Sequence, residues 1–492
     1  MTRLLVRTRV AAPVLLSVAV TTAFLLGVAQ QAGLRPLVAL MLASAVASTL
    51  YLMWPLDPAY TLSAAIFLSP LSGNWGELGF PSGVDPDRLL LVLGVLQVLV
   101  RAPAMRTRPQ VRLGFAHVVL TLATAYAVAS ALFAGTLYSK ADLFRIVDAF
   151  GVLPFLVFLV APLAFRTRRH RGILLVTLVS LGAYLGLTTL FEMVHLNALV
   201  FPRYIVNQSY GIHFGRGRGP FADAVANGFA CAVCSLACGV AVASWPGMRR
   251  KVLAGLIGLL CVAGAFLSLE RSVWIGASVG IAIAMLTTRR LRRYVLPIAT
   301  VIVVSVLVAL ALIPGLRATV NGRISNTTYD RQNLTVAGLN MIKARPLTGF
   351  GWGQFQRNSL LYFRQSQNYL LTDENQYGLH NFLLTYAVEL GLPGATLWAL
   401  ALLTGVGSAM LSRGPPDLQL WRRVLLATLV IFVVVANSIP PEEFPNLSLW
   451  LLAGVAFSGR YVRSRSLSAG DRPARGRNGA TMVVVAHRPA EV

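Results

Sequence analysis

The chain has 492 residues, of which 56% are hydrophobic and 12% charged, and its net charge is +25 at pH 7. Soluble domains carry about twice that charged fraction, so the composition excludes a soluble globular protein and indicates a polytopic membrane protein. The basic residues cluster between apolar runs, where the positive-inside rule places cytoplasmic loops. There they orient the chain and contact anionic lipid headgroups, so the charge does not indicate nucleic-acid binding. The clusters are Arg3/Arg7/Arg9, Arg101–Arg112, Arg166–Arg171, Arg249–Lys251, Arg289–Arg293, Arg413–Arg423 and Arg460–Arg465.

Apolar runs near the ~20 residues that cross a bilayer recur along the whole chain. In lipid these runs must be helices, because every backbone polar group needs an internal partner. We therefore predict an all-α polytopic fold with about 12–14 transmembrane helices and both termini in the cytoplasm. The candidate runs lie near residues 11–30, 35–54, 60–79, 88–100, 113–134, 146–165, 172–191, 222–243, 252–269, 272–288, 294–313, 381–411, 423–440 and 446–459.

Two places in this series allow alternative forms. The third and fourth runs are interrupted by prolines, so they are either a re-entrant pair or longer tilted helices. Residues 252–288 form either one very long helix or a hairpin that turns at Glu270 and Arg271. The hairpin keeps both flanking basic clusters in the cytoplasm, so we expect the hairpin, with its turn at the outer face.

The spans and connections divide the chain into five parts. These are N-terminal transmembrane helices (1–210), central helices with arginine motifs (211–313), a large periplasmic loop (314–380), C-terminal helices (381–460) and a disordered basic cytoplasmic tail (461–492). The loop has about 65 residues, and connections of that length usually carry function. Its apolar pattern predicts a short amphipathic helix, the turn-rich stretch TGFGWGQF and a second helix.

Arginines at the outer face run against the positive-inside trend and need another explanation. A guanidinium matches two phosphate oxygens at once and stays charged at any working pH. Several of them converging on one pocket would stabilise a leaving pyrophosphate. The alternative is structural salt bridges, in which Glu270, Asp330 and Asp223 neutralise Arg271, Arg331 and Arg218 respectively. The outer-face cations are Arg216, Arg218, Arg271, Arg317, Arg323, Arg331, Lys343, Arg345, Arg357 and Arg364.

His380 precedes the apolar run 381–411 and has two interpretations. An imidazole with a pKa near its ordinary value of ~6.5 can accept a hydroxyl proton and act as a general base. The alternative is a solvated residue at a helix start. Asn381, Thr385 and Glu389 are spaced four apart, and a polar stripe that enters a span should face the bundle interior. We therefore expect this helix to line a cavity below His380.

Other motifs in the sequence are not expected to form a catalytic, nucleotide or metal site. Cys231, Cys234 and Cys238 lie at helical spacing in an apolar run and are expected to be small packing residues. Gly349, Gly351 and Gly353 do not fit the nucleotide-binding spacing, and we expect a turn that lets the backbone approach a ligand or the membrane. No cluster of His, Cys and carboxylate residues has metal-ligand spacing.

Four segments together resemble the O-antigen ligase and polymerase superfamily. The strongest are PLTGFGWGQF (346–355) and HNFLLTYAVELGLPGA (380–395), which follow the family's Gly-rich loop and His-Asn…Glu pattern. RGPFADAVANGFA (218–230) is similar to its Arg…Gly-x-Phe segment, and LSLERSVWIGA (267–277) to its Ser-Arg-x-x-Trp hairpin, with Glu270 in place of the usual Ser. The resemblance covers roughly residues 210–400.

The resemblance implies a GT-C-like, metal-independent, inverting glycosyltransferase without a cofactor, in the bacterial inner membrane. Such an enzyme takes a glycan from undecaprenyl pyrophosphate at the periplasmic face and passes it to an acceptor hydroxyl. Carried onto this chain, His380 is the base, and Arg218 and Arg271 hold the pyrophosphate. The remaining expected binding residues are Arg216, Arg331, Arg345, Asn227, Asn381 and Glu389.

The acceptor stays open at the level of sequence. A ligase that transfers to the lipid A core in lipopolysaccharide biosynthesis, a polymerase of lipid-linked polysaccharide repeat units and a protein O-oligosaccharyltransferase share these motifs, and we place the ligase first. A membrane transporter is the alternative from another class. It is disfavoured because most ionisable groups lie at the membrane faces and no inverted repeat is evident.

Overall fold

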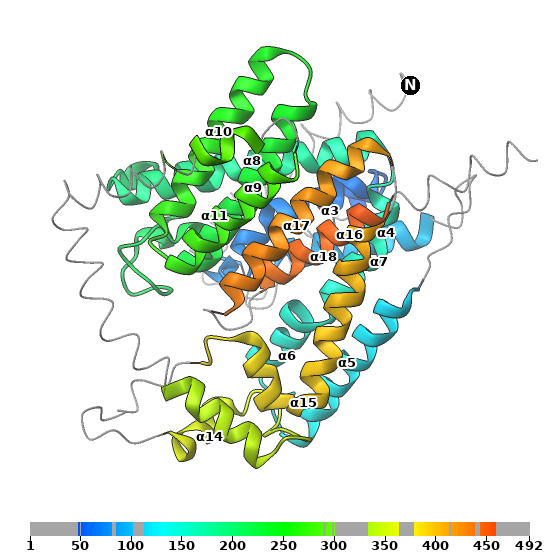
Figure 1. The fold of residues 1–492 in the computed structure, drawn as a ribbon, viewed down its shortest axis with the longest axis vertical. Coiled ribbons are helices and arrows are strands. Elements are labelled where there is room, and N and C mark those ends of the chain that lie inside the picture. Colours follow the sequence, from blue (N-terminus) through cyan, green and yellow to red (C-terminus); the bar gives the residue numbers. More distant parts are fainter. Residues whose placement is uncertain are drawn as a thin grey trace, which may run out of the picture.

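Helices and the turns between them make up the part of the chain that the computed structural model describes (Figure 1). The described residues are 48–49, 51–80, 85–101, 113–288, 292–297, 300, 333–363, 378–412, 415–437 and 443–458. The predicted span 11–30, most of the spans 35–54 and 294–313, the tail 461–492 and Arg331 lie outside these ranges.

The main helices follow the predicted apolar runs. Over the described ranges they are α3 (Pro58–Leu68), α4 (Pro86–Arg101), α5 (Phe115–Phe133), α6 (Lys140–Phe144), the π-helix η3 (Arg145–Phe150), α7 (Val152–Ala164), α8 (Arg168–Met193), α9 (Ala224–Ser244), α10 (Met248–Leu267), α11 (Arg271–Leu286), α14 (Phe355–Ser359), α15 (Phe382–Leu402), the π-helix η10 (Leu403–Gly407), α16 (Ser408–Leu411), α17 (Pro416–Ala436) and α18 (Glu443–Phe457).

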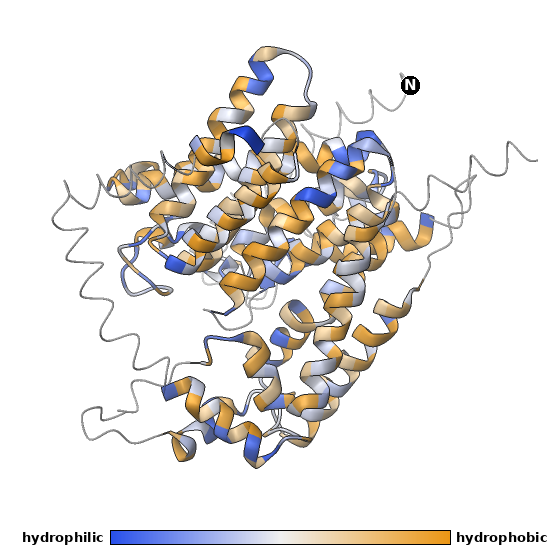
Figure 2. Cartoon of the chain, in the orientation of Figure 1, coloured by the Kyte–Doolittle hydropathy of each residue, from blue (hydrophilic) through white to orange (hydrophobic). Residues whose placement is uncertain are grey.

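Length and hydropathy confirm a multi-pass membrane protein. Among the described residues, 7 helical runs are long and apolar enough to cross a membrane. Hydrophobic residues cover most of their length (Figure 2). The runs are Phe115–Phe133, Lys140–Ala164, Arg168–Met193, Ala224–Ser244, Met248–Leu267, Phe382–Leu411 and Pro416–Ala436, with shorter apolar helices at Pro58–Leu71 and Arg271–Leu286.

Small residues allow α8, α9 and α10 to pack closely. A Cβ added at Gly182 of α8 would lie 2.6 Å from the Sγ of Cys261 on α10. Cys231, Cys234, Cys238 and Cys261 are all buried and form no disulfide with one another. The predicted packing role of the cysteines agrees with this arrangement.

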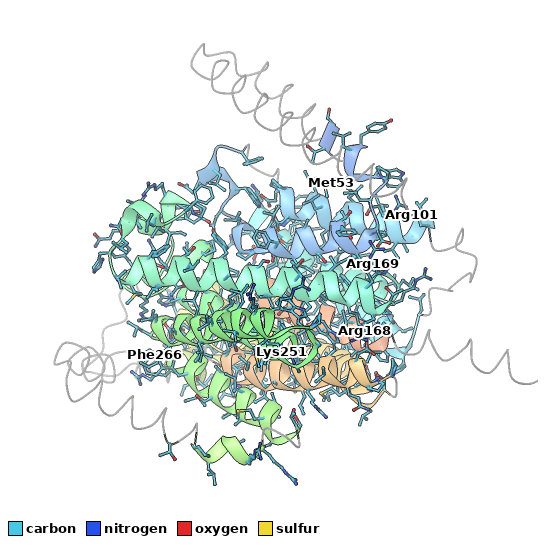
Figure 3. The ribbon with its side chains drawn as sticks, turned by 90° about the horizontal axis from the view of Figure 1, so that it is seen from above. Met53, Arg101, Arg168, Arg169, Lys251 and Phe266 are labelled. Carbon is cyan, nitrogen blue, oxygen red and sulfur yellow. The ribbon has the colours of Figure 1, made fainter. Side chains whose placement is uncertain are left out.

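One end of the helix bundle gathers the basic clusters. The Arg171 guanidinium pairs with Asp417 at the start of α17 and donates to the carbonyl of Phe165 (3.1 Å) and the hydroxyl of Ser458 (3.3 Å). The end of α7, the starts of α8 and α17 and the end of α18 therefore meet there. Arg101, Arg168 and Arg169 lie on one side of the molecule in Figure 3. We call this end of the bundle the basic end and the opposite end the outer end.

Residues 252–288 form two helices rather than one. The chain leaves the helical conformation between α10 and α11, where Leu269 has φ +53°. Gly228 of α9 packs against this break, since a Cβ there would lie 2.7 Å from the Oγ of Ser268 and 2.9 Å from a methyl of Val273. The expected turn at Glu270 and Arg271 is therefore present, at the end of α10 that lies away from the basic end.

The predicted span 381–411 is not one straight helix. Gly391 interrupts α15 with φ 70° and ψ 175°, a conformation that glycine adopts readily. The rings of Phe382 and Trp398 lie 4.9 Å apart, whereas sixteen residues of straight helix would separate them by roughly 24 Å. The segment Phe382–Leu390, which we call the N-terminal half of α15, therefore folds back along the rest of the helix. Helical periodicity alone does not reveal this reversal.

Candidate active site

The outer end of α17 connects two parts of the chain that carry predicted site residues. Helix α11 packs closely on α17, because a Cβ at Gly276 would lie 3.3 Å from the carbonyl oxygen of Ile431 and one at Gly280 would lie 2.9 Å from that of Ala427. The contacts move backward along α17 as they move forward along α11, so the helices are antiparallel (Figure 1). This register places Arg271, the first residue of α11, level with the end of α17.

The N-terminal half of α15 starts beside the same end of α17. The Asn381 side chain donates to the side-chain oxygen of Asn437, the residue that follows α17, at 2.7 Å. Asn381 also caps its own helix, because its side chain accepts from the amide of Leu384 at 3.0 Å. His380 is the preceding residue. The structure thus brings His380, Asn381 and Arg271 to one end of the bundle, opposite the basic end.

Arg271 is exposed at the first turn of α11. The adjacent Glu270 is buried and pairs with Arg216. Arg216 belongs to the segment between α8 and α9 (194–223), which we call the first outer loop. That loop also reaches the α10–α11 turn through the amide of Gly217, which donates to the carbonyl of Leu267 at 2.9 Å. The alternative in which Glu270 neutralises Arg271 is wrong, since Arg216 pairs with the Glu270 carboxylate. Arg271 makes no ion pair with any residue that the structure describes, and it lies at a helix N-terminus, where the helix dipole favours anions.

Arg218 has a different environment and is 0% exposed. Its guanidinium donates to the carbonyls of Ile205, Asn207 and Tyr210, with Nη2 to Ile205 at 2.6 Å. Its Nε lies 3.7 Å from the Glu192 carboxylate. Burial lowers the pKa of Arg218, and Glu192 acts in the opposite direction. These contacts commit its donors to folding the outer loop, so the geometry does not support the expected pyrophosphate contact.

The other residues of the Arg218 motif hold the same loop. Asn227 is fully buried and donates to the Thr189 hydroxyl at 2.8 Å and to the carbonyl of Gly217 at 2.9 Å. Asp223 caps α9, accepting from the amide of Val225 at 2.6 Å. The partner of Arg218 is therefore Glu192, and the alternative pairing with Asp223 is wrong. Asn227 acts within the protein, in support of the loop that carries Arg216.

Glu389 lies near the reversal of α15 and is 1% exposed. It pairs with Arg145 of η3, whose guanidinium lies 4.2 Å above the centre of the Trp352 ring. Sequence reasoning missed Arg145. The one feature of the sequence that could have identified Arg145 is its position as a charged residue beside the predicted span 146–165, in the segment Lys140–Phe150. Glu389 is therefore buried and neutralised by a guanidinium from another helix.

The Gly-rich loop docks on the reversal of α15. The amides of Phe350 and Gly351 donate to the carbonyls of Val388 and Glu389, each at 2.9 Å. Gly349 is required there, because a Cβ would lie 2.5 Å from the Glu389 carbonyl oxygen and its φ is +65°. The close backbone approach predicted for these glycines is present, and the backbone that they approach is that of α15.

Of the two remaining predicted arginines of the large loop, the structure describes Arg345. Arg345 is exposed at the end of a helical stretch over 333–344, with its guanidinium 4.9 Å above the centre of the Phe350 ring. It therefore lies on the Gly-rich loop, near the reversal of α15. Arg331 lies outside the described residues. Among the described residues, no group of three or more His, Cys, Asp and Glu side chains could hold a metal ion.

Comparison with known protein families gives one match. Residues 256–399 match the family model for O-Antigen ligase. The match confirms the resemblance predicted from the sequence, and it includes the α10–α11 turn, the Gly-rich loop and most of α15. Arg271, Arg345, His380, Asn381 and Glu389 lie inside the matched range, whereas Arg216, Arg218 and Asn227 precede it. No curated protein sequence matches the chain.

Proposed function

On the premise that residues 256–399 are an O-antigen ligase domain, we propose that the chain is an inverting glycosyltransferase. It moves a glycan from undecaprenyl pyrophosphate to a hydroxyl of the lipid A core, at the periplasmic face of the bacterial inner membrane. The register of α11 on α17 and the bond between Asn381 and Asn437 carry this proposal. Together they bring a candidate base and a guanidinium from distant segments to one end of the bundle.

The reaction assigns a role to each group. The His380 imidazole accepts the proton of the acceptor hydroxyl as its oxygen attacks the anomeric carbon. The bond from that carbon to the pyrophosphate oxygen breaks on the opposite face, which inverts the configuration. Undecaprenyl pyrophosphate leaves with an added negative charge, which Arg271 stabilises through paired hydrogen bonds. No metal or cofactor is needed in this scheme, because the donor's phosphoester bond supplies the free energy.

The remaining groups support these two. Asn381 caps the helix that follows His380 and ties it to α17. Arg216 neutralises Glu270, so the carboxylate does not compete with phosphate for Arg271. Arg331 and Arg345 are proposed contacts from the large loop. Arg218 and Asn227 are assigned to the architecture of the outer loop instead of the pyrophosphate.

Transfer by the purified protein, with a defined lipid-linked glycan and lipid A core as acceptor, tests the proposal. The His380→Ala variant should lose transfer, by about 10²–10⁴-fold for a general base, while staying folded. His195→Asn is the matched control, because His195 is an exposed histidine of the first outer loop. Near-normal transfer by His380→Ala would remove His380 from the mechanism. Extension of the lipid-linked glycan itself, without transfer to lipid A core, would identify a polymerase.

A further inference from the structure

The N-terminal half of α15 is short and is held at its two ends. At its start, Asn381 binds Asn437 after α17. At its other end, the amide of Leu392 donates to the carbonyl of Pro346 at 2.8 Å, and the Gly-rich loop binds the carbonyls of Val388 and Glu389. Because an isolated helix of this length is unstable in water, its direction depends on these attachments. The direction of this segment determines where His380 lies.

The strongest attachment at the reversal is the ion pair between Arg145 and Glu389. The Glu389 side chain is 2% exposed and that of Arg145 is 26% exposed. A carboxylate buried to this degree is strongly destabilising without a partner. Arg145 is the ion-pair partner of Glu389 among the described residues. Asp142 is a further charged group near enough to repel the Glu389 carboxylate electrostatically.

Arg145 is itself held in place from both sides. Trp352, whose ring it covers, donates from its indole nitrogen to the carbonyl of Asp142 at 3.0 Å. The carbonyl of Trp352 accepts from the Thr136 hydroxyl at 2.7 Å. Three residues after Arg145, Asp148 pairs with Arg88 at the start of α4. The π-helix η3 is therefore anchored to the Gly-rich loop, to the turn after α5 and to α4.

Glu389 is too far along the helix to touch His380. Nine residues separate them, which corresponds to roughly 13 Å of helical rise. Arg145 therefore acts on His380 through the orientation of a helix. It does not act by hydrogen bonding to the imidazole through Glu389.

We propose that Arg145 is a positioning residue, whose ion pair with Glu389 sets the direction of the N-terminal half of α15 and so places His380 against the acceptor hydroxyl. This inference rests on the proposed function for its kinetic readout. A misplacement of about 1 Å in a reacting group can lower turnover by 10²-fold, so a remote ion pair can control the rate without contacting the substrate.

Four variants test this role in the transfer assay. Arg145→Gln and Glu389→Gln should each lower kcat by about 10²-fold with little change in KM. In the double variant, kcat should fall by less than the product of the two single fold-changes. Arg145→Lys keeps the charge and should recover part of the rate. Arg169→Gln, an exposed arginine at the basic end, is the control. The pH dependence of kcat should not change, because the imidazole keeps its immediate surroundings.

Hydrogen exchange supplies a readout that does not depend on transfer. The amides of residues 382–390 should exchange faster in Arg145→Gln than in the wild type, and exchange in α17 should not change. Unchanged exchange in 382–390 would overturn the proposal. A raised KM at constant kcat would also overturn it, because Arg145 would then bind substrate. If His380→Ala transfers normally, the proposed function fails, and the exchange experiment still decides whether Arg145 orients this helix.

Discussion

Arg218 and Arg271 lie at the same end of the bundle in two regions that are built in opposite ways. Arg218 is enclosed by the first outer loop and donates to three backbone carbonyls. Arg271 is exposed at the start of α11, and its neighbouring carboxylate is taken by Arg216. In sequence both look like pyrophosphate ligands. The comparison teaches that the acceptors around a guanidinium decide whether it supports the fold or remains available for chemistry.

The largest effect should come from removing the buried member of this pair. Arg218→Leu leaves Glu192 buried without a cation and three carbonyls without donors, so it should lower the free energy of unfolding by about 3–5 kcal/mol. Thermal unfolding of the detergent-solubilised protein measures this loss. If Arg218→Leu keeps wild-type stability and loses transfer only, Arg218 belongs with Arg271 after all.

Arg271→Ala should show the reverse behaviour. Loss of one group that stabilises a developing oxyanion lowers kcat by about 10²–10³-fold, while an exposed substitution changes stability by only about ±0.5 kcal/mol. Arg271→Lys should also be poor, because an ammonium lacks the paired geometry. Arg203, an exposed arginine of the outer loop, supplies the control Arg203→Ala. Near-normal turnover of Arg271→Lys would contradict the phosphate contact.

Gly391→Ala extends the comparison to the backbone around the site. Alanine at φ 70° costs about 1–3 kcal/mol in strain, and its Cβ would also overlap the carbonyl oxygen of Leu347. We expect lower stability together with lower transfer, because the reversal of α15 carries His380. Gly172 of α8 has open space around it, so Gly172→Ala should be neutral or slightly stabilising. Equal behaviour of the two alanine variants in unfolding experiments would argue against a strained reversal.

The smallest effect concerns the link between α15 and α17. Asn381→Ala removes a helix cap worth about 1 kcal/mol together with the bond to Asn437. Asn381→Asp keeps the cap but loses the amide donor, so it separates the two contributions. The free energy of unfolding should fall mainly in Asn381→Ala, whereas the rate of transfer should fall in both variants. If transfer is unchanged in Asn381→Asp, the bond to Asn437 does not help to place His380.

Much of the site could be chosen from the sequence, but its internal contacts could not. Arg271, His380 and Asn381 could be predicted because they belong to segments with recognisable patterns. In the structure they lie at one end of the bundle. Arg145 carries no such pattern, and only its contact with Glu389 identifies it. The salt bridges considered as the alternative for Glu270 and Arg218 also named the wrong partners, because the observed partners come from loops whose paths are not encoded in local spacing.

By itself the sequence determined the membrane class, most of the helical ranges among the described residues and the end of the bundle where the polar groups lie, because hydrophobic length and charge asymmetry act locally along the chain. Tertiary structure decided which arginine is buried, which carboxylate it pairs with and where α15 reverses. These outcomes depend on backbone carbonyls and side chains that come from distant segments, and a buried charge is stable only where such partners meet it.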